Sequence, residues 1–150
     1  MNFTVTEMKA KHIPQIALLE KECFSLPWSE NSLSQELENA GSHFLVAEAE
    51  NCVAGYIGVQ EICGEAYITN VAVFSDFRKN GIGKALIDAA CKGALQRNCE
   101  FITLEVRQSN KNAISLYEAA EFEKVGVRKN FYSQPTEDAV LYTKYFTKEV

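Results

Sequence analysis

The turn at residues 78–84, which reads RKNGIGK, holds the residues whose spacing points most directly to chemistry. Gly81 and Gly83 allow backbone N–H groups to approach an anion closely, and the first turn of a following helix offers unpaired donors with a partial positive charge. The basic side chains at the turn belong to Arg78, Lys79 and Lys84. The turn predicts a phosphate or pyrophosphate site, and the alternative is a glycine turn that binds nothing.

The spacing of the glycines separates this turn from two other phosphate-binding turns. It does not match G-x-x-x-x-G-K-[ST], so a P-loop nucleotidase is not indicated. It does not match G-x-G-x-x-G either, and it follows the fourth expected strand rather than the first. A Rossmann dinucleotide site is therefore not indicated.

Glu105 is a second candidate, because it is a carboxylate in the middle of the apolar stretch FITLEV at 101–106. In a strand, Thr103 and Arg107 lie on the same face as Glu105. A carboxylate placed in this way can act as a general base. The alternative is the polar face of a half-exposed strand, with a pair between Glu105 and an arginine.

Alternation and helical periodicity predict the elements that position these residues. Strands are expected at 2–8, 43–49, 53–62, 65–74, 101–106, 123–132 and 139–146. Helices are expected around Pro14, from Ser29 to about Ala40, at 82–95 and at 112–120. The apolar sides expected of the first and third helices are Ile16, Leu18, Leu19 and Cys23, and Ile82, Leu86, Ile87, Ala90, Ala94 and Leu95.

The order of these elements predicts the class of fold. Three consecutive strands with short links predict an antiparallel meander, whereas a helix that joins two strands favours parallel pairing. An α/β (α+β) protein with a mixed sheet is therefore expected.

Length and charge narrow the class of protein. A chain of 150 residues with a formal net charge of −5 fits one domain, 1–150, and opposes binding to nucleic acid. Residues 78–111 nevertheless carry seven Lys or Arg against three Asp or Glu, which suggests a small anionic ligand or else a solvated face.

The five cysteines form no C-x-x-C pair, which argues against a zinc site. The sequence shows no bilayer-spanning run or signal-peptide pattern, so a cytoplasmic protein without a membrane partner is expected.

Several segments resemble those of the GNAT N-acetyltransferases. Arg78-x-x-Gly81-x-Gly83 is similar to that family's [QR]-x-x-G-x-[GA] signature, and ITNVAV at 68–73 resembles its fourth strand. Five further segments resemble those of the RimI-like ribosomal-protein-alanine N-acetyltransferases. They are FSLPWS at 24–29, LEVRQSN at 104–110, AISLYE at 113–118, RKNFY at 128–132 and EDA at 137–139. The resemblance covers nearly the whole chain and implies the GNAT fold, a mixed sheet of about seven strands flanked by about four helices.

Two positions depart from the family pattern. Glu121 stands where glycine is usual, at a helix end that often closes in a left-handed turn, so lower stability or a different turn is expected. Phe131 stands where a tyrosine is common, which affects one substrate contact.

The resemblance implies that acetyl-CoA is the co-substrate and that no metal takes part. Val71, Ala72 and Val73 would lie beside the pantetheine arm, where a backbone N–H could polarise the thioester. Asn110 would make a further contact. The residues implied to hold the pyrophosphate are Arg78, Lys79, Asn80, Gly81, Ile82, Gly83 and Lys84.

Acetyl transfer would use Glu105 as general base and Tyr117 as general acid toward the leaving sulfur. A tyrosine near pKa 10 is a weaker acid than a thiol near 8.5, so Tyr117 could supply only a hydrogen bond, or serve as a core aromatic. Trp28 and Tyr132 would line the acceptor groove, with an aromatic anchor under the first helices as the alternative for Trp28.

The implied acceptor is the N-terminal alanine of a small-subunit ribosomal protein. A protein α-amine has a pKa of about 7.7–8.0 and lysine one near 10.4, so a single carboxylate suits an α-amine better. The alternatives are a small-molecule amine or a lysine as acceptor, and an acyl-CoA-binding sensor without turnover. A monomer or weak homodimer is expected.

Overall fold

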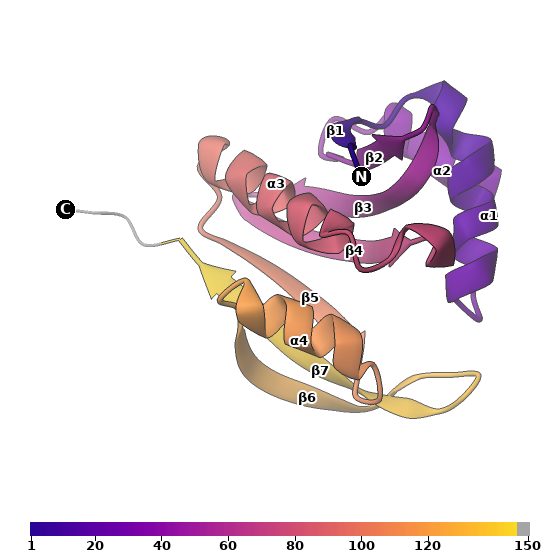
Figure 1. Cartoon of the computed structure of the whole chain (residues 1–150). Coiled ribbons are helices and arrows are strands. Elements are labelled where there is room, and N and C mark those ends of the chain that lie inside the picture. Colours follow the sequence, from indigo (N-terminus) through magenta and orange to yellow (C-terminus); the bar gives the residue numbers. More distant parts are fainter. Residues whose placement is uncertain (147–150) are drawn as a thin grey trace.

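The computed structural model describes residues 1–146 as one seven-stranded sheet with helices on both faces (Figure 1). The strands are β1 Thr4–Glu7, β2 Leu45–Ala49, β3 Cys52–Ile62, β4 Glu65–Val73, β5 Phe101–Arg107, β6 Glu123–Tyr132 and β7 Glu137–Tyr145. The α-helices are α1 Ile13–Cys23, α2 Glu30–Leu37, α3 Ile82–Gln96 and α4 Lys111–Ala119. The predicted order of elements and the predicted α/β class are confirmed.

The sheet is mixed, as predicted, in the order β1-β2-β3-β4-β5-β7-β6. β1 to β4 pair antiparallel, so the expected meander is present. β5 pairs parallel with β4, because the crossover through α3 returns the chain to the same end of the sheet. β7 then lies between β5 and β6 and is antiparallel to both.

The helix ends follow local chemistry. Pro14 lies in the first turn of α1, where its missing N–H leaves no donor unsatisfied, and Ser29 caps α2 by accepting a hydrogen bond from the Ser32 N–H at 3.1 Å. α2 ends at Leu37 rather than near Ala40, since Asn39 Oδ1 accepts from the Gly41 N–H at 2.9 Å and turns the chain. No helix within residues 1–146 is long and apolar enough to cross a membrane.

Two residues expected on buried helix sides lie at the surface. Leu18 is 60% exposed and Leu95 is 53% exposed. Helical spacing puts positions 13, 16, 17 and 20 of α1 on one side, so Glu20 joins the buried stripe and Leu18 falls outside it. The buried side of α3 includes Cys91 in place of Leu95.

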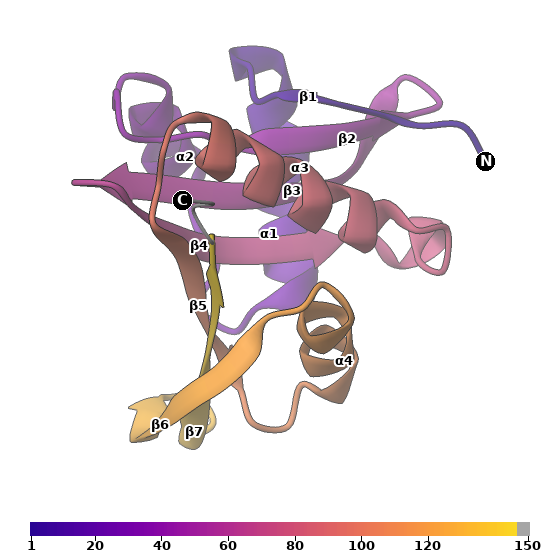
Figure 2. The same cartoon turned by 90° about the vertical axis from the view of Figure 1, so that its left-hand side faces the viewer.

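Each face of the sheet has its own core. Figure 2 shows α3 in front of the strands and α1 behind them. The core under α3 and α4 includes Ile57, Ile68, Leu86, Ile102 and Tyr117. The core under α1 and α2 includes Ile16, Leu19, Leu33 and Tyr56. Most of β3 is therefore buried and β4 is mostly half-buried, whereas much of β6 is exposed.

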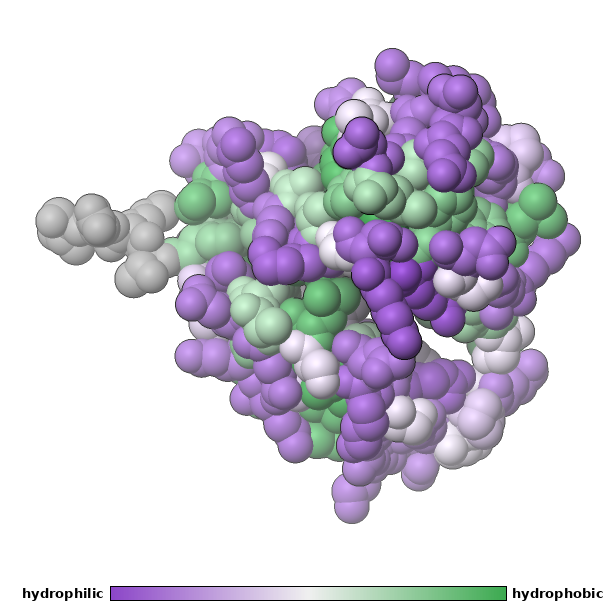
Figure 3. Space-filling view, viewed as in Figure 1, coloured by the Kyte–Doolittle hydropathy of each residue, from purple (hydrophilic) through white to green (hydrophobic). Residues whose placement is uncertain are grey.

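The sheet parts between β4 and β5. Their pairing joins Glu65–Tyr67 to Phe101–Thr103 and goes no further among the described residues. An extra residue at Thr69 makes a bulge in β4, and bulges increase strand twist and end pairing. Figure 1 shows the two strands diverging, and the space-filling view shows the surface hollowed between the two halves of the sheet (Figure 3).

Candidate active site

The predicted anion-binding turn connects a short 3-10 turn at Ser75–Phe77 to the N-terminus of α3. Gly81 is the N-cap of α3 with a φ of 79°, and Lys79 has a φ of 64°. A Cβ at Gly81 would meet nothing within 4 Å, so glycine is favoured there by the left-handed backbone rather than by space.

The backbone N–H groups of this turn are unpaired. Within residues 1–146, none of the N–H groups from Lys79 to Lys84 donates to another protein atom, and the first helical bond runs from Ala85 N–H to the Gly81 carbonyl at 3.0 Å. Lys79, Gly81 and Lys84 are exposed. Unpaired donors at the start of a 15-residue helix, flanked by two lysines, suit a phosphate group.

Two polar side chains fix the shape of the turn. Asn80 Nδ2 donates to the carbonyls of Phe77 and Arg78 at 3.0 and 3.1 Å. Arg78 Nε donates to the Val73 carbonyl at 3.0 Å, so its guanidinium holds the end of β4 against the turn. These contacts place the unpaired N–H donors at a fixed position relative to β4.

Gly83 serves packing, in contrast to Gly81. A Cβ at Gly83 would lie 3.0 Å from Leu116 Cδ2, so the close approach of α3 and α4 favours glycine. Lys84 Nζ lies 2.7 Å from Asp88 on the exposed side of α3. Ile82 is buried and anchors the first turn of the helix in the core.

Val71, Ala72 and Val73 lie beyond the point where β4 leaves β5. On one side, Val71 pairs with Ile57 and Val73 with Gly55 of β3. On the other side, no strand pairs with these residues within the described chain. An unpaired strand edge offers N–H and C=O groups to an extended ligand.

Glu105 lies on the face of β5 that it shares with Thr103 and Arg107, as predicted. Its Oε2 atom is buried and has no hydrogen-bond partner among residues 1–146, while Oε1 lies 3.7 Å from Arg128 Nε in β6. The nearby arginine thus comes from the neighbouring hairpin rather than from β5. A buried, unpaired carboxylate oxygen is unfavourable unless a ligand supplies the missing donor.

Tyr132, at the end of β6, lies near Glu105. Burial and the negative charge of Glu105 raise the pKa of Tyr132 to about 12. The guanidinium of Arg107 lies 4.5 Å from the centre of the Tyr132 ring and donates to the carbonyls of Ser133 and Pro135 at 2.9 Å each. Arg107 therefore fixes the hairpin loop that follows Tyr132.

Tyr117 lies in α4 with only 6% of its surface exposed. Its ring packs 5.7 Å from Phe122 and 6.5 Å from Tyr142. Burial, and to a smaller extent Tyr132, raises the pKa of Tyr117 above its ordinary value. The ring is thus a core aromatic on the face of the sheet that α3 and α4 cover.

Trp28 lies in the loop between α1 and α2. Its ring is partly buried, 5.7 Å from the ring of Phe44, and its backbone N–H donates to Glu20 Oε1 at 2.9 Å. A surface groove beside it is lined by Pro27, Trp28, Ser32, Gln35 and Glu36. Trp28 therefore packs on the helical layer and also borders a groove.

Asn110 is the N-cap of α4, where its Oδ1 accepts from the Ala113 N–H at 3.2 Å. The preceding Ser109 N–H donates to the Glu137 carboxylate at 2.5 Å, and Arg107 lies 3.3 Å from the same carboxylate. The contacts with Ser109 and Arg107 hold the pKa of Glu137 below its ordinary value. They also tie the loop after β5 to β7.

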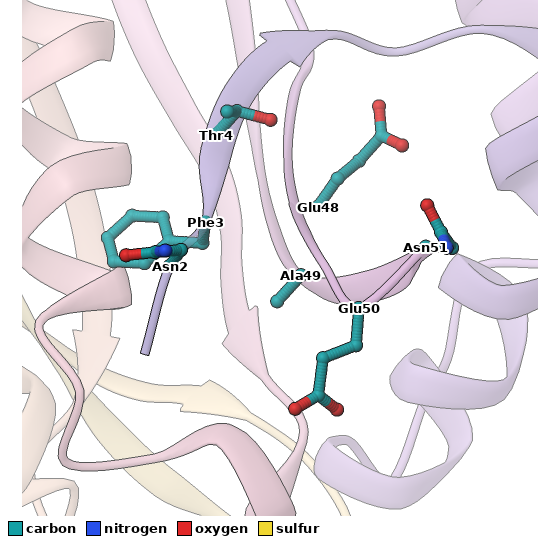
Figure 4. A pocket seen from close by; sticks show the side chains of 7 residues that line it. All are labelled: Asn2, Phe3, Thr4, Glu48, Ala49, Glu50 and Asn51. Carbon is teal, nitrogen blue, oxygen red and sulfur yellow. The ribbon is translucent and has the colours of Figure 1, made fainter.

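A pocket between β1 and the β2–β3 turn holds none of the predicted site residues. Figure 4 shows its lining, which is Asn2, Phe3, Thr4, Glu48, Ala49, Glu50 and Asn51. The carboxylates of Glu48 and Glu50 point in different directions there. Within residues 1–146, no group of three or more His, Cys, Asp or Glu gathers as a metal site would require.

The mixed seven-stranded sheet with four α-helices is the GNAT fold that the resemblance implies. Residues 13–122 match the family model described as "Acetyltransferase (GNAT) family", and the chain therefore belongs to the GNAT family. The donor is acetyl-CoA, which the GNAT acetyltransferases use.

Known proteins resemble the chain over nearly its whole length. The [ribosomal protein bS18]-alanine N-acetyltransferase of Haemophilus ducreyi is 34% identical over 133 residues, covering 85% of this chain and 89% of that protein. The protein of the same name from Escherichia coli K12 is 29% identical over 142 residues, covering 92% and 94%. The crystal structure of the ribosomal-protein-S18-alanine N-acetyltransferase from Escherichia coli gives a TM-score of 0.90 at 25% identity, covering 99% and 97%.

Sequence reasoning assigned no role to Glu20, Arg107, Arg128 or Glu137. The helical spacing of Ile13, Ile16 and Ala17 would have placed Glu20 on the buried side of α1. The partners of Arg128 and Glu137 depend on which strands are neighbours, and no local pattern carries that information.

Proposed function

We propose that this protein transfers the acetyl group of acetyl-CoA to the N-terminal α-amine of a protein, namely the N-terminal alanine of a small-subunit ribosomal protein. The observation that carries the proposal is the unpaired Glu105 Oε2 atom beside the parting of the sheet. It occurs in a chain similar over nearly its whole length to [ribosomal protein bS18]-alanine N-acetyltransferases. Residues 1–150 would act as one domain in the cytoplasm, where ribosomal proteins are made.

The unpaired donors of the glycine turn fit the pyrophosphate of acetyl-CoA. The N–H groups from Lys79 to Lys84 would hold it, with Lys79 and Lys84 supplying charge and Arg78 and Asn80 fixing the turn. Val71, Ala72 and Val73 would bind the pantetheine arm along the free edge of β4, and Asn110 would contact it from the start of α4. Bound acetyl-CoA supplies the activated acetyl group.

Glu105 would accept the proton that the incoming ammonium group must lose. Its free Oε2 atom can receive an N–H donor, and Arg128 at 3.7 Å from Oε1 orients the carboxylate. An α-amine with a pKa of about 7.7–8.0 loses its proton more easily than a lysine with a pKa near 10.4. The difference in the free energy of deprotonation is roughly 3–4 kcal/mol. One carboxylate therefore suits an α-amine.

Tyr117 would donate a hydrogen bond to the departing sulfur. Because burial raises the pKa of Tyr117, full proton transfer to a thiolate is less favourable than for a free tyrosine. Its hydroxyl would stabilise the charge that develops on sulfur without ionising.

The acceptor peptide would lie between the Trp28 loop and the hairpin loop that follows Tyr132. The first loop borders a groove, and the second is fixed by Arg107. Both loops lie outside regular elements and can differ in shape between relatives without disturbing the sheet.

Mass spectrometry with two acceptor peptides tests this proposal. Both begin with alanine and contain one internal lysine, and one has a blocked N-terminus. We expect one added acetyl group, on the α-amine of the free peptide. Equal turnover of the blocked peptide would show a lysine acceptor and overturn the proposal, as would turnover of small amines alone. Saturable acetyl-CoA binding without acetylation of any amine would identify a sensor.

A further inference from the structure

The last turn of α1 contains a carboxylate that the proposed acetyl transfer does not use. Glu20 is completely buried, with 0% of its surface exposed. Three donors from three different parts of the chain converge on it. Trp28 N–H donates to Oε1 at 2.9 Å, and the Tyr56 hydroxyl and Asn70 Nδ2 donate to Oε2 at 2.7 and 3.0 Å.

A buried carboxylate is an unfavourable choice at this position. Desolvation raises the pKa of Glu20, and the three hydrogen bonds offset part of that effect. An apolar side chain would complete the buried side of α1 beside Ile16 and Ala17 without the desolvation. What the carboxylate adds is a fixed arrangement of the three donors that it joins.

These donors connect the two substrate-binding parts of the site. Trp28 belongs to the loop at the acceptor groove, and Asn70 directly precedes the Val71–Val73 segment of β4. The bond from Trp28 N–H to Glu20 is the one hydrogen bond recorded between residues 25–28 and other parts of the described chain. Without this bond, the loop would be held mainly by the packing of Trp28 against Phe44.

We propose that Glu20 is a positioning residue, which holds the Trp28 loop in a fixed place relative to the thioester-binding segment of β4. The acceptor amine then arrives in line with the acetyl group. The functional meaning of this role rests on the proposed acetyl transfer. Removing the carboxylate should weaken use of the acceptor and leave acetyl-CoA binding intact, because the donors at 79–84 are untouched.

Glu20→Gln is the test variant, since it keeps the size of the side chain but places an amide donor against two other donors. Glu61→Gln is the matched control, because Glu61 is a carboxylate with a side chain 12% exposed that pairs with Arg97 away from the Trp28 loop. For Glu20→Gln we expect the acceptor KM to rise about fivefold or more, because one hydrogen bond to a charged group is lost. The acetyl-CoA Kd should stay within about twofold of the wild-type value. Glu61→Gln should change neither.

Trp28 is the single tryptophan of the chain, so its fluorescence reports on the loop without any turnover. Acrylamide should quench Glu20→Gln more strongly than the wild type or Glu61→Gln. Unchanged quenching in a folded Glu20→Gln, or an unchanged acceptor KM, overturns the proposal. A wild type that acetylates no amine contradicts the proposed function instead, and the quenching comparison still decides the role of Glu20.

If Glu20→Gln does not fold, a second variant still tests the proposal. Asn70→Ala leaves the carboxylate and its bond to Trp28 in place and removes the link to β4. A higher acceptor KM with unchanged acetyl-CoA affinity supports the role of Glu20. Wild-type values of both contradict it.

Discussion

Glu105 and Tyr117 differ in their surroundings. Glu105 has a free carboxylate oxygen, whereas burial raises the pKa of Tyr117. A phenol that resists ionisation is a poor proton donor to a thiolate but remains a good hydrogen-bond donor. At this scale we therefore expect a large effect from changing Glu105 and a smaller one from changing Tyr117.

For Glu105→Gln we expect turnover to fall by at least ~10²-fold, the usual contribution of a general base. The acetyl-CoA affinity should stay the same, because the donors at 79–84 are not altered. Steady-state kinetics and calorimetry measure the two quantities, with the exposed Glu123→Gln as control. An unaffected rate would remove Glu105 from the mechanism.

For Tyr117→Phe we expect turnover to fall by about tenfold or less, which corresponds to one hydrogen bond. The ring remains to pack against Phe122 and Tyr142, so the free energy of unfolding should change little. The pH dependence of kcat measures the role directly. A loss near 10³-fold would instead identify Tyr117 as a proton donor.

Among the elements, the end of α4 shows how the chain accommodates a departure from the family pattern. Glu121 adopts a φ of 71°, the left-handed conformation in which glycine is preferred. The Phe122 N–H donates to the Tyr117 carbonyl at 3.0 Å and the Glu121 N–H to the Glu118 carbonyl at 3.0 Å, so the helix closes with a Schellman motif. The left-handed turn is therefore retained, and the lower stability stays a prediction.

We expect Glu121→Gly to raise the free energy of unfolding by about 1 kcal/mol, because glycine adopts this conformation without steric cost. Urea denaturation measures the change. The control is Ser115→Gly on the exposed side of α4, which should lower it by about 0.5 kcal/mol. A destabilised Glu121→Gly would show that the Glu121 side chain makes a favourable contact.

For the molecule as a whole, the ionisation of Glu137 makes the free energy of unfolding depend on pH. Its carboxylate ties the loop after β5 to β7, and the folded pKa lies below the ordinary value of 4.5. Folding therefore favours the ionised form. This contribution is complete above pH 4.5 and is lost as the pH falls through the folded pKa.

The difference in Tm between the wild type and Glu137→Gln should be constant from neutral pH down to about 5 and should shrink on further acidification. Thermal melts followed by circular dichroism measure it. Glu123→Gln is the control for a surface carboxylate without these partners. A difference that widens in acid would contradict this assignment.

Local patterns predicted most of the fold and the place of the glycine turn. Alternation placed β6 at 123–132, and the turn at 78–84 begins α3 as expected. The bulge at Thr69 was not predicted, and the arginine that lies beside Glu105 was not identified as Arg128. The bulge depends on the register between β3 and β4, and the Arg128 contact depends on β7 lying between β5 and β6, which residues close in sequence do not determine.

The short ladder between β4 and β5 also decides how the molecule carries mechanical load. The N-terminus leads into β1 at one edge of the sheet, and β7 lies in the other half (Figure 1). A pull on the two ends would load the pairs that join Glu65–Tyr67 to Phe101–Thr103. This seam is shorter than the β3–β4 and β5–β7 ladders on either side of it, and a break there would separate the two walls between which the substrates are proposed to meet.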